Sequence, residues 1–237
     1  MKRVRKTAWL LFLTLGFEAG GLAGDKPSAE LKERVKQAGP GMYRVGDVTV
    51  DAKLGVAVFP AKDNQHVGLI EYALVTETGK IHESFLSTKA RPSDIHAALL
   101  LLGVKPPGGA SVDVGWKVGG KWVRKPIPDC IGQYPLEAAS ERDDKVTDKS
   151  FDTKSRDWKW TGSRIQNGKT AADVSGSILS LQSDTEALAL IEPMVDTGRF
   201  GSHVWPKRVP KLGQAVQVFI RLKKTASTES GAGKTPI

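Results

Sequence analysis

The feature that most constrains this fold is a period of two in the apolar residues, which begins just before Val45. Val45, Val48 and Val50 are followed by the turn-forming stretch 51–55, and the pattern then resumes at Val56. Successive side chains of a β-strand point to opposite faces, so this alternation indicates strands with one buried face. We interpret the region as an antiparallel β-hairpin.

The same pattern predicts strands along most of the remaining chain. They are expected at 67–76, 81–87, 111–118, 121–125, 157–162, 164–181 and 215–222. Gly119 and Gly120 predict a two-residue turn, which would pair Lys117 with Trp122. A second turn of this kind is expected near Asn167 and Gly168.

One convincing helix is expected, at about residues 92–102. Pro92 suits a first helical turn, Asp94 complements the positive end of the helix, and Gly103 ends it. The predicted fold class is therefore a β-rich α+β protein. Antiparallel hairpins would surround one core, together with this one principal helix.

The first 23 residues are typical of a secretory signal. Residues 1–6 carry four basic side chains, the stretch 8–17 is uncharged and apolar, and small residues follow. The apolar stretch 8–17 is shorter than the roughly 20 residues that a membrane-spanning helix needs. We predict a bacterial exported protein, periplasmic or secreted, with no transmembrane span once the signal is removed.

The rest of the chain divides by composition. Residues 24–42 are interpreted as a linker or short helix and 43–222 as a single domain. Within that domain, 137–157 is a polar excursion with few apolar residues. Residues 223–237 have the composition of a disordered basic tail.

A lone cysteine excludes several classes of site. With only Cys130, the chain can form neither a disulfide scaffold nor, by itself, an iron–sulfur cluster. We expect Cys130 to be a buried, inert thiol.

Positive charge is concentrated toward the C-terminus. The chain has a formal net charge of +9, and the segment 199–228 contains seven basic residues and no acidic one. For an exported protein this indicates an anionic envelope component, either a polymer or lipid head groups, rather than nucleic acid. The tryptophans leave two interpretations open, since Trp158 and Trp160 share one strand face and could be core residues or a flat binding platform.

A charged residue interrupts the apolar face of one predicted hairpin. A turn at 78–79 would pair Leu74 with Glu83 and place Glu83 toward the core. A buried carboxylate is costly unless it is paired or protonated. Because the helix that follows must fold back over the sheet, our hypothesis is that His96 pairs with Glu83.

A metal site is the alternative for the same residues. His82, Glu83 and His96 offer the imidazole and carboxylate groups that zinc or copper prefers, and Asp94 lies nearby in the sequence. Alternation places His82 and Glu83 on opposite faces, so they could share a metal only if the strand twists or bulges there. Ser84, His82 and Asp94 include the residue types of a hydrolase triad, but the spacing along a strand does not favour a direct hydrogen bond.

Two segments resemble the YdjY-domain family of exported bacterial proteins. They are Gly79-Lys-Ile-His-Glu-Ser84 and Pro92-Ser-Asp-Ile-His-Ala-Ala-Leu-Leu100, and 160–163 and 171–177 also fit, so that the resemblance spans about 48–181. It implies that His82, Glu83, Ser84 and His96 are motif positions, but it implies no established activity. A ferredoxin-like label given to some members cannot apply to a chain with a single cysteine.

These observations favour an exported, non-enzymatic envelope binding or accessory module whose ligand the sequence does not identify. Its expected binding residues are His82, Glu83, Ser84, Asp94 and His96. The alternative is a metal-binding protein or metal-dependent enzyme that uses His82, Glu83 and His96 with zinc or copper.

Overall fold

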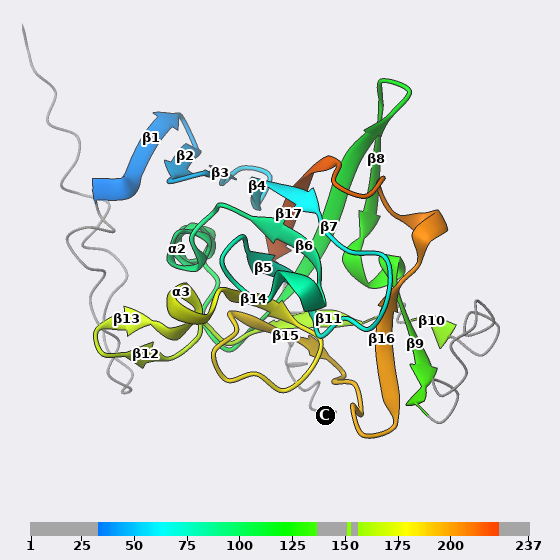
Figure 1. Cartoon of the computed structure of the whole chain (residues 1–237). Coiled ribbons are helices and arrows are strands. Elements are labelled where there is room, and N and C mark those ends of the chain that lie inside the picture. The colour runs from blue at the N-terminus through cyan, green and yellow to red at the C-terminus, as the bar shows by residue number, and fades with distance from the viewer. Residues whose placement is uncertain (1–32, 137–150, 153–155, 223–237) are drawn as a thin grey trace, which may run out of the picture.

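The computed structural model describes residues 33–136, 151–152 and 156–222. Eight of its strands hydrogen-bond in a closed cycle and form a β-barrel (Figure 1). In order round the barrel they are β4 (Val56–Asp63), β17 (Ala215–Leu222), β7 (Gly108–Val118), β11 (Asp157–Trp160), β15 (Ala189–Glu192), β14 (Ser177–Ser180), β5 (Tyr72–Thr76) and β6 (Ser84–Thr88). Pairing of β6 with β4 closes the cycle.

One face of these strands forms the barrel interior. Paired residues on adjacent strands share a face, so the strand registers define this inner face all the way round. It includes Phe59, Val218, Val114, Trp158, Ile191, Leu179, Leu74 and Leu86, all of which are buried. The opposite face carries exposed polar residues such as Lys62, Gln217 and Lys159. The apolar face seen in the sequence is therefore buried because the sheet closes on itself.

Further elements extend the barrel or lie beside it. A meander of β1 (Val35–Gly39), β2 (Met42–Val45) and β3 (Val48–Asp51) continues from β4, and β8 (Lys121–Pro126) pairs only with β7. The smaller sheets contain β9 (Ile131–Pro135), β10 (Phe151–Asp152) and β16 (Phe200–Val204), and β12 (Ile165–Gln166) with β13 (Lys169–Thr170). The helices are α2 (Pro92–Leu101) and α3 (Ala171–Ser175), with the short 3-10 turns η1 (Ile81–Glu83), η2 (Ile127–Cys130) and η5 (Pro206–Arg208).

The predicted α+β class of antiparallel hairpins around one core is wrong. The described part of the chain is strand-rich and built on a closed eight-stranded barrel, and α2 is a peripheral element beside β3 and α3 (Figure 1). Alternation shows that a strand has one buried face but not what covers that face. Here closure depends on pairings between distant segments, such as β7 with β11 and β4 with β6.

The hairpin predicted around residues 78–79 is also wrong. The turn itself forms, because the amide of Gly79 donates to the carbonyl of Thr76. The chain then enters the 3-10 turn η1, and β6 starts beside Tyr72 and runs parallel to β5. Glu83 lies in η1 and is partly exposed, so it does not face the core.

Several other local predictions are confirmed. The helix begins at Pro92, β3 and β4 form the hairpin around residues 51–55, and β17 spans 215–222. Gly119 and Gly120 both have positive φ angles, as a tight hairpin turn requires, and Lys117 pairs with Trp122. The structure decides between the two interpretations left open for Trp158 and Trp160, since both are buried in the core.

The regions outside the barrel domain are only partly described. Strands β1 and β2 occupy part of 24–42, which was interpreted as a linker or short helix. The predicted signal peptide (1–23), most of the polar excursion and the basic tail (223–237) lie outside the described residues. None of the described helices is long and apolar enough to cross a membrane.

Candidate functional site

The residues predicted as a site do not meet in one place. His82 and Glu83 are neighbours in η1, where Nε2 of the largely exposed His82 lies 3.4 Å from Oε1 of Glu83. Ser84 is buried at the start of β6, and its hydroxyl donates to the carbonyl of Ile81 at 3.3 Å. The motif positions 82–84 therefore form a local turn structure.

Glu83 belongs to a charged cluster that the alternation pattern does not predict. It lies close to Glu71, whose amide donates to the Glu83 carbonyl at 2.8 Å. Burial, and then the negative charge of Glu83, raise the pKa of Glu71. Nζ of Lys80 donates to the Tyr72 hydroxyl at 2.9 Å, and that hydroxyl lies 3.1 Å from Asp184. This bond to Tyr72 is the main cause of the raised pKa of Lys80.

His96 has a partner other than the predicted Glu83. Its Nδ1 accepts a hydrogen bond of 3.1 Å from Nε1 of Trp160, and the two rings are nearly parallel. Burial lowers the pKa of His96. Accepting at Nδ1 also requires that a neutral imidazole carry its proton on Nε2. His96 thus joins α2 to the barrel strand β11.

Asp94 is a buried partner of an arginine before β1. Nε of Arg34 donates to Oδ1 of Asp94 at 2.8 Å, and a second guanidinium nitrogen binds Oδ2. This pair connects the segment leading into β1 with the first turn of α2. The structure therefore gives Asp94 a role in packing.

No metal centre forms among these side chains. In the part of the chain that the structure describes, no three His, Cys, Asp or Glu side chains are grouped so that they could hold a metal ion. His82 and Glu83 contact each other, whereas His96 contacts Trp160. Cys130 is fully buried, as predicted, and burial raises the pKa of its thiol to about 12.

A hollow in the described surface lies instead beside the β7–β8 hairpin. Pairing between β7 and β17 extends to Gly115, and beyond it the hairpin continues alone and projects above the barrel (Figure 1). We call the hollow the hairpin groove. It measures about 570 Å³ and is lined by Trp116, Lys117, Val118, Gly119, Val209, Lys211, Leu212, Gly213 and Gln214.

Gln214 holds the two walls of the groove together. Its side-chain amide donates to the carbonyl of Lys117 at 2.9 Å, and its Oε1 accepts from the amide of Lys211 at 3.0 Å. The backbone amide of Gln214 also donates to the Lys211 carbonyl. The groove is therefore a preformed hollow between two secured segments.

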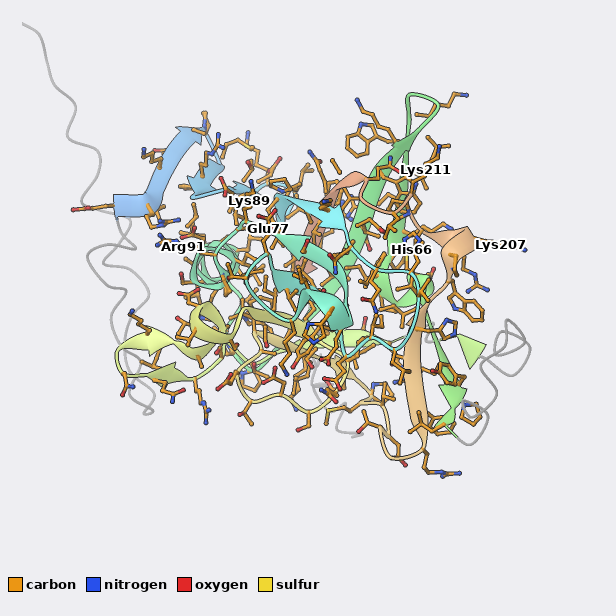
Figure 2. The ribbon with its side chains drawn as sticks, in the orientation of Figure 1. His66, Glu77, Lys89, Arg91, Lys207 and Lys211 are labelled. Carbon is orange, nitrogen blue, oxygen red and sulfur yellow. The ribbon has the colours of Figure 1, made fainter. Side chains whose placement is uncertain are left out.

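The groove and the adjacent hairpin combine positive charge with aromatic rings. Lys117 and Lys211 line the groove, and no acidic residue does so among the described residues. Figure 2 shows Lys211 beside the hairpin. Nζ of Lys117 lies 5.5 Å from the centre of the Trp122 ring, and Nζ of Lys125 lies 6.0 Å from that of Trp116. Each face of the hairpin thus carries a tryptophan with a lysine near its ring.

Nearby acidic charge is already compensated. Asp113 lies on β7 below the hairpin tip, where Arg124 binds its carboxylate at 2.7 Å and Arg221 approaches to 3.5 Å. Arg208 precedes Val209, which lines the groove, and its guanidinium lies 4.7 Å from the ring centre of Trp205. The surroundings of the groove therefore add to its positive potential.

The sequence identified both halves of this site but not that they meet. Lys211 belongs to the basic C-terminal segment, and the residues around the Gly119–Gly120 turn were assigned to a hairpin. Leu212 and Gln214 carry no signal in the sequence, since an exposed leucine and a glutamine are ordinary loop residues. Only the pairing of β17 with β7 brings the two segments together.

One buried acid–base pair was also missed. Asp63 is fully buried at the end of β4, and Nε2 of His66 lies 2.7 Å from its Oδ1. Burial raises the pKa of Asp63 to about 6, although His66 opposes this shift. The spacing of three residues was the available sequence signal, but the polar surroundings of His66 gave no indication that Asp63 was buried.

Comparison with known proteins adds no relative. No family model, curated protein or solved structure matched the chain. The resemblance to the YdjY-domain family thus stays a prediction. The groove brings together two ammonium groups, an indole and apolar walls.

Proposed function

We propose that this protein is an exported, non-enzymatic binding module that holds an anionic component of the bacterial envelope in the hairpin groove. The observation that carries the proposal is the meeting of Lys117 and Lys211 in a preformed hollow that no carboxylate lines among the described residues. Two ammonium groups without acidic partners attract anions, and the low-dielectric wall of Trp116 strengthens that attraction.

The shape of the site supports binding rather than turnover. A hollow of about 570 Å³ is within the size range of small-molecule sites and could take one or two units of an anionic polymer. The aromatic groups on both faces of the hairpin offer flat apolar surface beside the charges. Export, as the N-terminal sequence predicts, would place this surface among envelope polymers and lipids.

The test is a titration of the protein with a soluble acidic polymer, polygalacturonate, in which calorimetry measures binding at low and at high salt. The double variant Lys117→Glu, Lys211→Glu should weaken binding by about tenfold or more, because each exposed charge contributes about 1 kcal/mol in water. Binding by the unaltered protein should also fall as salt rises from about 0.05 M to about 0.5 M.

The matched control is the double variant Lys53→Glu, Lys89→Glu, which makes the same charge change at two exposed lysines outside the groove. Lys89 is labelled in Figure 2. It should bind almost as well as the unaltered protein. Equal losses in both proteins would show that net charge alone governs binding, and the groove would lose its role. No binding of any kind would reject the proposal.

A further inference from the structure

The exposed apolar residues around the groove suggest what kind of anionic surface it meets. Val118 and Trp122 at the hairpin tip are 57% and 56% exposed, and Leu212 on the facing segment is 65% exposed. Val118 and Leu212 line the same groove. A soluble anion would not require large apolar side chains on and beside a projecting hairpin, where water contacts them.

Basic residues surround this apolar tip. Lys121 pairs with Val118 across the hairpin and Lys117 pairs with Trp122, while Lys211 lies next to Leu212. All three lysines are exposed. Val118 and Trp122 lie on opposite faces of the hairpin, and each is paired with a lysine. Exposed tryptophan and aliphatic side chains flanked by lysines suit the interface of an anionic bilayer, where apolar groups enter and ammonium groups meet the phosphates.

We infer that the tip formed by Val118, Trp122 and Leu212 inserts into the interfacial layer of an anionic lipid membrane, with Lys117, Lys121 and Lys211 contacting the head groups. This inference deepens the proposed function, because it names the phosphate-bearing lipid surface as the anionic partner. The projecting geometry supports it, since the β7–β8 hairpin extends beyond the barrel (Figure 1).

The experiment uses vesicles of phosphatidylglycerol mixed with phosphatidylcholine, against vesicles of phosphatidylcholine alone. Part of the lipid is brominated, and bromine quenches only tryptophan that enters the bilayer. The fluorescence of Trp122 is obtained as the difference between the unaltered chain and Trp122→Phe. Quenching of any other tryptophan, including Trp9 in the apolar stretch 8–17, is the same in both proteins and cancels. We expect this difference signal to fall by at least about half with the anionic vesicles and to stay unchanged with phosphatidylcholine alone.

A second variant tests the apolar contact at constant charge. The double variant Val118→Ser, Leu212→Ser should lower the affinity for the anionic vesicles by about tenfold, because two apolar side chains no longer leave water. The control Leu54→Ser, Val67→Ser makes the same two changes at residues that are 71% and 85% exposed outside the groove, and it should leave the affinity unchanged.

The outcomes separate this inference from the proposed function. Binding of polygalacturonate without quenching of Trp122 by lipid would overturn the membrane inference and leave the anion-binding module standing. Vesicle binding that the serine variants do not weaken would also overturn it, since charge alone would then hold the protein. If the unaltered protein binds neither polygalacturonate nor the anionic vesicles, both the proposed function and the membrane inference are rejected.

Discussion

At the residue scale, the buried Asp63 and the partly buried His96 give the stability of this barrel opposite pH dependences. Asp63 has a pKa raised from 3.8 to about 6, so the folded protein holds its proton more tightly than the unfolded chain. That contribution is fully present below 3.8 and is lost as the pH rises through 6. His96 has a lowered pKa, so its contribution is present above the ordinary value of 6.5 and declines as the pH falls below it.

The Asp63→Asn variant separates these two effects. The rise in the pKa of Asp63 from 3.8 to about 6 means that its ionised carboxylate destabilises the fold by about 3 kcal/mol. We expect the free energy of unfolding at pH 8 to rise by about 1–3 kcal/mol in the variant, because the neutral amide does not carry the desolvation cost of the ionised carboxylate. Urea unfolding at pH 5 and pH 8 measures this. A variant that is less stable than the unaltered protein at pH 8 would show that the Asp63–His66 pair stabilises the fold in its ionised form.

At the scale of elements, the turns could be predicted from local sequence, but the strand with which each strand pairs could not. The glycine pair at 119–120 determined both the turn and the register of β7 with β8, because a two-residue turn allows only one pairing. The turn at 78–79 also formed, but η1 followed it, and β6 paired in parallel with β5. Asn64 binds the carbonyls of Ile81 and Ser84 and so holds η1 from a distant segment. The sequence of η1 alone contains no sign of that contact.

The attachment of the N-terminal meander to α2 depends on Arg34. Substituting methionine for Arg34 removes both hydrogen bonds to the buried carboxylate of Asp94. We expect a loss of about 3 kcal/mol in the free energy of unfolding, because an uncompensated charge stays buried. Chemical denaturation of Arg34→Met, Asp94→Asn and the double variant gives the coupling between them. Additive losses would contradict a direct interaction.

At the scale of the whole molecule, the closed barrel makes one core from segments far apart in the chain. Leu86 on β6 pairs with Asp63 on β4 at the seam that closes the cycle, and it is fully buried. Because every barrel strand contributes to the same apolar cluster, the described domain should unfold as one unit.

The substitution Leu86→Ala tests this unity. It should lower the free energy of unfolding by about 2–5 kcal/mol, the usual cost of a cavity in a well-packed core. Tryptophan fluorescence reports on the far side of the barrel, and far-ultraviolet circular dichroism reports on all strands. We expect both signals to change at the same urea concentration in the unaltered and variant proteins. Two separated transitions would mean that the seam opens before the rest of the barrel.

The sequence by itself determined several local features of this protein: the β3–β4 hairpin, the start of α2, the Gly119–Gly120 hairpin and the last strand, β17. It also indicated the basic C-terminal segment and the burial of the lone cysteine, whereas it left Trp158 and Trp160 open between core residues and a binding platform. These features follow from spacing, turn chemistry and burial preference within a few residues. The tertiary structure alone decided that the sheet closes and that His96 binds Trp160. It likewise decided that Lys211 meets the hairpin to form a groove. Each of these depends on contacts between residues distant in the chain, and alternation along a strand carries no information about which strand lies next to it.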